Sequence, residues 1–158
     1  MKIKYYIIHC SDTPDGQYFD KYDIINWHTL PKPRGNGWSR PGYNKLILLD
    51  GTEQLLIPYD ADGVVEWNEV ANGARGFNNV SIHTCYIGGK GGDTRTPEQI
   101  EALKCDILNA IELFPDILIG GHYNFSKSKT CPNFDVEQFC KDIGVPDKNI
   151  IPHAKRYV

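Results

Sequence analysis

No stretch of apolar residues in the sequence approaches the roughly 18 that a membrane-spanning helix needs. The apolar run near the start, Tyr5 to Ile8, is too short for the core of a signal peptide, and no small-residue cleavage site follows it. We therefore expect no membrane partner. We also expect synthesis in the cytoplasm without an export signal.

Basic clusters and paired cysteines are missing as well. The net charge is -3, and no run of Lys or Arg stands out, so nucleic acid is not an expected partner. The five cysteines are odd in number and include no CxxC pair, which argues against a disulfide framework. Free cysteines are usually buried, and we expect this of Cys10, Cys85, Cys105 and Cys140.

The composition is that of an ordinary globular domain. The chain has 158 residues, of which 41% are hydrophobic and 23% are charged. This length supports one hydrophobic core without disulfides. Because no repeat or linker divides the sequence, we expect a single domain over residues 1–158. Its core would cover about 3–143 and its C-terminal tail about 144–158. The sequence does not define the oligomeric state, and a monomer is favoured.

Strand and helix signals are mixed along the chain. Apolar runs predict strands at residues 4–10, 64–71, 80–87 and 116–119, and the Asp50-Gly51 pair predicts a hairpin. Capping signals predict helices at 21–29 after Asp20, from 97 to about 114 after Thr96, and at 135–142. Apolar residues from Ile100 to Phe114 recur on one helical face. The sequence therefore predicts an α/β fold with a central mixed sheet flanked by helices.

Two histidines stand at the ends of apolar strands. His9 follows "YYII", and His122 follows "DILIGG". If these strands are neighbours, both imidazoles emerge at one edge of the sheet, where a loop can return Cys131. Two His and one Cys are a ligand set that zinc accepts, and three protein ligands leave the fourth position open for water, as in catalytic sites. The alternative from spacing alone is two hydrogen-bonding histidines and a core cysteine.

Short motifs along nearly the whole chain extend this pattern. In order they read "IIHCSDTP", "INWH", "GWSRPGYN", "LLDGT", "ANGARGFNNVSI", "CYIGG", "DTRTPEQIEAL" and "GGHYNFSKSKTCPNFD". Together they resemble the zinc-dependent N-acetylmuramoyl-L-alanine amidases of the phage T7 lysozyme type, which are related to the peptidoglycan recognition proteins. The resemblance covers about residues 3–143. It implies that family's fold, one Zn²⁺ per chain and peptidoglycan as substrate, cleaved between N-acetylmuramic acid and the L-alanine of the stem peptide.

The resemblance also implies roles for single residues. His9, His122 and Cys131 match the three metal ligands of the family. Tyr43, in "PGYN", matches the catalytic tyrosine, and Lys129 matches the catalytic lysine. Both would stabilise the oxyanion.

The match to the family is weaker at two places. The loop before Cys131 looks one residue longer than in the T7 protein, so Lys127 competes with Lys129. Asn44 stands where the family often has histidine, which puts substrate placement in doubt. Candidate substrate contacts are therefore Asn44 itself, and Arg75 and Asn79 beside the cleft that the family would have.

Four other side chains have both a structural and a functional interpretation. We expect His28 to be a packing or supporting residue, His83 to have a cross-strand or surface role, and His153 to be solvated. Trp67 is expected in the core or at the rim rather than as a wall of the substrate site.

Three functions remain in competition. The first is a phage or prophage endolysin, or an amidase exported by another route. The second is a non-catalytic peptidoglycan-binding domain, but relatives of that kind typically lose the cysteine that Cys131 matches. The third, binding of a phage RNA polymerase as in the T7 relative, finds no support in this acidic sequence.

Overall fold

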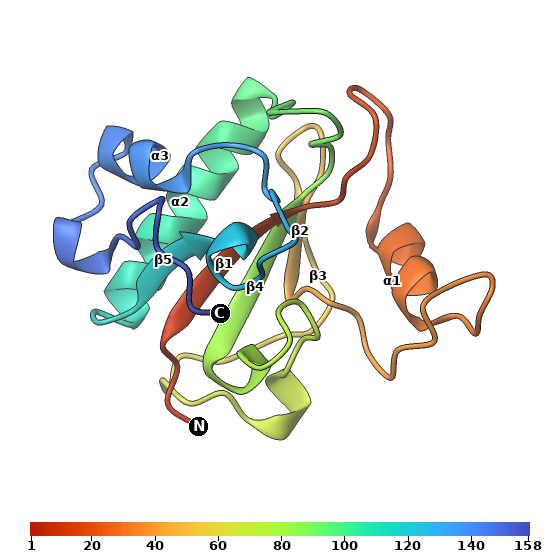
Figure 1. The fold of residues 1–158 in the computed structure, drawn as a ribbon, viewed down its shortest axis with the longest axis horizontal. Coiled ribbons are helices and arrows are strands. Elements are labelled where there is room, and N and C mark those ends of the chain that lie inside the picture. Colours follow the sequence, from red (N-terminus) through yellow and green to blue (C-terminus); the bar gives the residue numbers. More distant parts are fainter.

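The computed structural model describes residues 1–158 and contains one five-stranded sheet of order β3-β2-β4-β1-β5. β2 and β3 form the antiparallel hairpin predicted at Asp50-Gly51, and all other neighbouring strands are parallel. The predicted α/β fold with a mixed sheet flanked by helices is confirmed (Figure 1). The strands are β1 (Tyr5–Cys10), β2 (Lys45–Ile47), β3 (Glu53–Leu55), β4 (Ser81–Tyr86) and β5 (Leu118–Gly121), and the helices are α1 (Lys21–Thr29), α2 (Pro97–Leu113) and α3 (Val136–Asp142).

Side-chain caps account for where the helices begin. The Asp20 carboxylate accepts hydrogen bonds from the backbone N–H groups of Tyr22 and Asp23, and the Asp23 carboxylate accepts one from the Asp20 N–H. Thr96 and Gln99 form the same reciprocal box at the start of α2. Such boxes satisfy N–H groups that a helix leaves unpaired at its start. Helices α1 and α2 therefore start at the predicted residues.

The two faces of the sheet bury different clusters. Tyr6, Ile8 and Cys10 of β1 belong to the largest cluster, which includes Leu103 and Ile107 of α2. Ile7 points the other way and packs in a smaller cluster. Because side chains alternate along a strand, His9 shares the face of Ile7, away from α2. Cys10 points to the opposite face, as predicted. In Figure 1, α2 and α3 lie on one side of the sheet and α1 on the other, where Ile24 of α1 packs with Leu46 of β2 and Cys85 of β4.

The strand predicted at residues 64–71 is wrong. Val64 makes one isolated bridge to Lys2, and Trp67–Glu69 forms a 3-10 helix. The buried Glu69 carboxylate accepts hydrogen bonds from the N–H groups of Asp60 and Glu66. These local side-chain bonds occupy backbone donors that a sheet ladder would otherwise use. Trp67 is not a core residue, since it is 81% exposed with the Arg40 guanidinium over its ring.

Helix α2 also differs from the prediction. Ile100 is 37% exposed, and Gln99 and Asp106 are buried. Gln99 donates to the carbonyl oxygens of Ile47 and Ile87, so its amide is paired with backbone at the end of β2 and just after β4. The helical periodicity of apolar residues predicts that Gln99 and Asp106 are exposed. Both are buried because their hydrogen-bond partners lie in segments far away in the sequence.

The cysteines are all free, and their burial follows the prediction with one exception. Cys10, Cys85 and Cys140 are buried, but Cys105 is exposed on α2. None of the helices has both the length and the apolar character needed to span a bilayer.

Candidate metal centre

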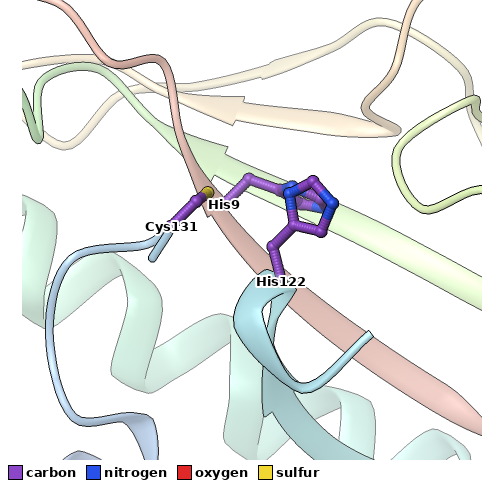
Figure 2. Close-up of side chains that lie close together, drawn as sticks. All are labelled: His9, His122 and Cys131. Atoms are coloured by element: carbon purple, nitrogen blue, oxygen red, sulfur yellow. The ribbon is translucent and has the colours of Figure 1, made fainter. Parts of the chain in front are cut away.

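Three side chains from distant parts of the chain converge at one end of the sheet. β1 and β5 pair in parallel, so their carboxyl ends lie side by side. His9 lies near the end of β1, and His122 directly follows β5 and opens a short 3-10 helix. The loop that follows returns Cys131. The possible ligand atoms of these three side chains all lie within 4.8 Å of one another (Figure 2).

Backbone contacts hold the Cys131 loop against the sheet. The Tyr123 N–H donates to the Cys131 carbonyl at 3.0 Å, and the Tyr86 hydroxyl donates to the Pro132 carbonyl at 2.7 Å. The Cys10 N–H lies 3.1 Å from the Cys131 sulfur and donates to it. Gly121 is required here, because a Cβ at this position would lie 2.8 Å from Cδ of Pro132. The thiol therefore has a defined position.

The two ring nitrogens of His9 have different surroundings. Nε2 of His9 lies 2.9 Å from Nδ1 of His83, so Nδ1 is the His9 nitrogen free for another partner. His83 lies on the neighbouring strand β4, where it pairs with Ile7 and therefore shares the face of His9. It has the cross-strand role expected of it, but it is fully buried rather than at the surface.

Burial keeps the imidazoles of this site neutral. Burial, with the charges of His122 and other neighbours, holds the pKa of His9 well below its usual value. Burial and the Lys129 ammonium lower the pKa of His122 to about 4. The hydrogen bond with Cys10, followed by burial, raises the pKa of the Cys131 thiol. The imidazoles can thus coordinate a cation directly, and a bound cation would ionise the thiol.

This donor set fits zinc. Zinc in proteins is held by imidazole nitrogen and thiolate sulfur, and tetrahedral coordination separates such ligands by roughly 3.5 Å. That separation falls inside the 4.8 Å within which the three ligand atoms lie. Three protein ligands would leave one coordination position of a tetrahedral zinc ion for water or substrate.

An open cleft of about 970 Å³ includes the three ligands in its lining. Tyr43, His28 and Trp38 contribute aromatic surface from the segment around and after α1. The Tyr43 ring lies 5.0 Å from the His9 ring, and burial raises the pKa of its hydroxyl. His28 accepts a hydrogen bond from the Gly42 N–H and packs against Tyr43, so it has the supporting role expected.

Lys127 and Lys129 both line the cleft and both are exposed. Their relations to the candidate ligands differ. The charge of Lys129 lowers the pKa of both His9 and His122, and Lys127 has no part in the shift at His122. Lys129 is therefore the lysine whose charge acts on both candidate histidine ligands.

The three candidate substrate contacts have different positions. Arg75 is exposed and lines the cleft. Asn79 is exposed but lies outside the lining. Asn44 is fully buried: its amide donates to the carbonyls of Ile57 and Glu69, and its Oδ1 accepts the His83 N–H. The structure brings only Arg75 of these three to the cleft.

His153 is exposed, as expected, but its ring also makes a contact. Its side chain is 49% exposed, and its Nδ1 lies 3.0 Å from the Tyr123 hydroxyl, which fastens the tail to the segment after β5. Sequence reasoning also missed the contact of His83 with His9. The available signal was a histidine in the middle of the predicted strand "VSIHTCYI". That this strand lies beside the strand of His9, with two other strands between them in sequence, could not be seen from the pattern.

The fold and the site together define a class. A His-His-Cys group at the carboxyl ends of parallel strands, in the lining of an open cleft, is a donor set typical of metal-dependent hydrolases.

The particular family follows from comparison with known sequences. The profile of the N-acetylmuramoyl-L-alanine amidase family matches residues 1–134, and the chain belongs to this family. It is thus an N-acetylmuramoyl-L-alanine amidase, a hydrolase of peptidoglycan, as its motifs predicted.

Individual relatives agree with this assignment. The endolysin of Escherichia phage T7 is 27% identical over 137 residues, which cover 84% of this chain and 82% of that protein. The amidase LysC from Clostridium intestinale has a similar fold, with a TM-score of 0.72 and 21% identity over 92% of this chain and 88% of LysC. A variant of Drosophila PGRP-LB in complex with tracheal cytotoxin has a TM-score of 0.70 and 20% identity, covering 96% of this chain and 85% of that one.

Proposed function

We propose that this protein is a zinc-dependent endolysin that hydrolyses the amide between the lactyl group of N-acetylmuramic acid and L-alanine. The observation that carries the proposal is the convergence of His9, His122 and Cys131 in the cleft of a chain from this amidase family. The endolysins of phages T7 and T3, to which the chain is similar, support a role in degrading the cell wall. The cell wall would then be its site of action.

His9, His122 and Cys131 would hold the metal. Bound there, zinc would supply Lewis acidity and lower the pKa of a bound water to roughly 7. His9 would use Nδ1, because its Nε2 is engaged by His83. The Cys10 N–H already donates to the Cys131 sulfur and would stabilise the thiolate form.

Lys129 and Tyr43 would stabilise the negative charge that develops on the carbonyl oxygen. Both line the cleft beside the candidate ligands. The raised pKa of Tyr43, caused mainly by burial, keeps its hydroxyl protonated at neutral pH, so that it can donate a hydrogen bond. Lys129 would supply a full positive charge. Donors fixed in place before reaction are the main source of such stabilisation.

The substrate would be the stem peptide of peptidoglycan. The cleft of about 970 Å³ is large enough for several residues of a muropeptide. Arg75 lies in the lining as an exposed guanidinium, which suits bidentate binding of a peptide carboxylate. The PGRP-LB variant with the same fold is bound to tracheal cytotoxin, which supports a ligand of this class. Nucleic acid is not part of this proposal.

The test is digestion of purified peptidoglycan by zinc-loaded protein, scored as new N-terminal alanine. We expect release that a zinc chelator stops and added zinc restores. Cys131→Ser should lose zinc and lose release, with Cys105→Ser as the matched control because Cys105 is exposed and distant from the cleft lining. Chelator-resistant release would contradict the zinc mechanism. Absence of release, with muropeptide binding unchanged in Cys131→Ser, would instead establish a recognition domain.

A further inference from the structure

The candidate ligand His9 is in contact with a second buried histidine that the amidase reaction itself does not use. We propose that His83 is a positioning residue, which fixes the tautomer and the ring orientation of His9 for metal binding. The inference rests on the zinc centre proposed above. It concerns this chain's own residues, so it can be tested by metal affinity and by spectroscopy as well as by activity.

The contact is short and fully enclosed. Nε2 of His9 and Nδ1 of His83 are 2.9 Å apart, which is hydrogen-bond distance. His9 is 1% exposed and His83 is 0% exposed. Both rings come from adjacent parallel strands and lie on the same face of the sheet. A hydrogen bond screened from water in this way defines one ring orientation of each partner.

The backbone and the surroundings hold His83 in turn. Its N–H donates to Oδ1 of Asn44 at 2.8 Å, and its carbonyl accepts the Asn44 N–H at 2.9 Å. Asn44 is itself fully buried. Gly73 closes the space on another side, because a Cβ there would lie 2.5 Å from Nδ1 of His83. The acceptor that faces His9 therefore has little freedom to move away.

Metal binding selects one of the two possible proton arrangements. A His9 that coordinates through Nδ1 must carry its proton on Nε2, and that N–H then donates to Nδ1 of His83. His83 must in consequence carry its own proton on Nε2. In the reverse arrangement His83 donates from Nδ1, and the proton of neutral His9 sits on Nδ1, where a metal would need the lone pair.

The ring of His83 makes a hydrogen bond through only one of its two nitrogens. Nε2 of His83 is buried and has no hydrogen-bond partner. Buried polar atoms without partners are rare, because they cost stability. A ring that satisfies only its Nδ1, and does so against a metal ligand, matches the known pattern in which the second nitrogen of a ligating histidine is held by a neighbouring acceptor.

Two isosteric variants separate this role from simple packing. His83→Leu and His83→Asn have side chains of the same branched shape and leave the same space where the ring was. Only Asn offers an oxygen at the place of Nδ1. We expect His83→Leu to weaken zinc binding by roughly 10–100-fold, measured by competition with a chromogenic chelator, and His83→Asn to bind close to the wild type.

The outcomes distinguish the possible failures. Equal loss of zinc affinity in the two variants would show that shape alone matters and would overturn the inference. Unchanged affinity in His83→Leu would overturn it too. A wild-type protein that binds no zinc would overturn the metal centre itself, and the inference with it.

A measurement on the wild type keeps the proposal testable if His83→Leu does not fold. Nitrogen-15 correlation spectra of the imidazoles report which ring nitrogen carries the proton. In the zinc-loaded protein we expect His9 and His83 both to be protonated on Nε2. A His83 protonated on Nδ1 would overturn the inference.

Discussion

Lys127 and Lys129 stand two residues apart in the same exposed loop, yet their surroundings differ. The charge of Lys129 lowers the pKa of both His9 and His122, and that of Lys127 has no part in the shift at His122. A cation that acts on both candidate ligands would also act on the carbonyl oxygen of a substrate bound in the cleft beside them. The two lysines are chemically identical, so their different effects on the candidate ligands come from their positions in the loop.

We expect Lys129→Ala to lower kcat by roughly 10²–10³-fold, the usual effect of removing one donor to an oxyanion. Zinc content should be unchanged, because Lys129 is not a ligand. Lys127→Ala is the matched control, since it removes the same charge from the same loop and should keep wild-type turnover. Steady-state kinetics on a soluble muropeptide, with zinc measured in each variant, checks this. A larger loss in Lys127→Ala would reverse the assignment.

The site could be predicted from the sequence only in part. His9, His122 and Cys131 stand out because their spacing and motifs point to one chemistry, and the structure brings them together. Asn44 and Arg75 could not be separated in this way. Both were expected near the substrate, but hydrogen bonds to Ile57, Glu69 and His83 bury Asn44 beneath the cleft. Those partners lie 13 to 39 residues away, beyond the reach of any local pattern.

At the scale of elements, helix α2 is attached to the sheet by a buried charge as well as by apolar packing. The Asp106 carboxylate accepts hydrogen bonds from the Tyr6 hydroxyl and the Lys45 ammonium, and from the Thr84 hydroxyl at 3.4 Å. These partners lie on β1, β2 and β4. The side chain of Asp106 is 4% exposed and that of Lys45 is 12% exposed, so neither charge is well hydrated. The group therefore joins the helix to three strands at once.

We expect Asp106→Ala to lower the free energy of unfolding by about 3–5 kcal/mol, because it leaves the Lys45 ammonium buried without its main partner. Glu101→Ala is the control on the same helix. Glu101 is exposed, and its loss should change stability by no more than about 0.5 kcal/mol. Urea unfolding of both zinc-free variants at pH 7 measures the difference. Equal, small effects would show that the apolar contacts of α2 carry its attachment alone.

Element ends were predictable where a cap lies within three or four residues, as at Asp20 and Thr96. Elements whose pattern depends on distant partners were not. Residues 64–71 have a strand-like composition, but Glu69 binds their backbone locally and a 3-10 helix forms. The helical pattern predicts that Asp106 is exposed. Its burial depends on pairing with Lys45, which lies 61 positions away in the sequence.

At the scale of the whole molecule, the zinc-free protein contains several histidines that are held neutral in the folded state. Burial lowers the pKa of His28 to about 4. Burial, with the charge of a neighbour, lowers the pKa of His122 to about 4 and that of His83 to about 3. In the unfolded chain each should titrate near 6.5. His28 and His122 line the cleft and His83 is buried beneath it, so all three imidazoles stay neutral at pH values where a free histidine would be protonated.

The sign of the resulting pH dependence follows from linkage. Between about pH 6.5 and pH 4 the unfolded chain binds more protons at these histidines than the folded protein does, so stability falls as the pH falls through this window. Urea unfolding of zinc-free protein at pH 7, 6, 5 and 4.5 should show this decline. His28→Gln removes one such site without touching the ligands. Compared with the wild type, it should reduce the slope by up to one bound proton, which separates the histidine effect from that of the carboxylates. Identical slopes in the two proteins would mean that the pKa of His28 is the same in the folded and unfolded states, and that burial does not lower it.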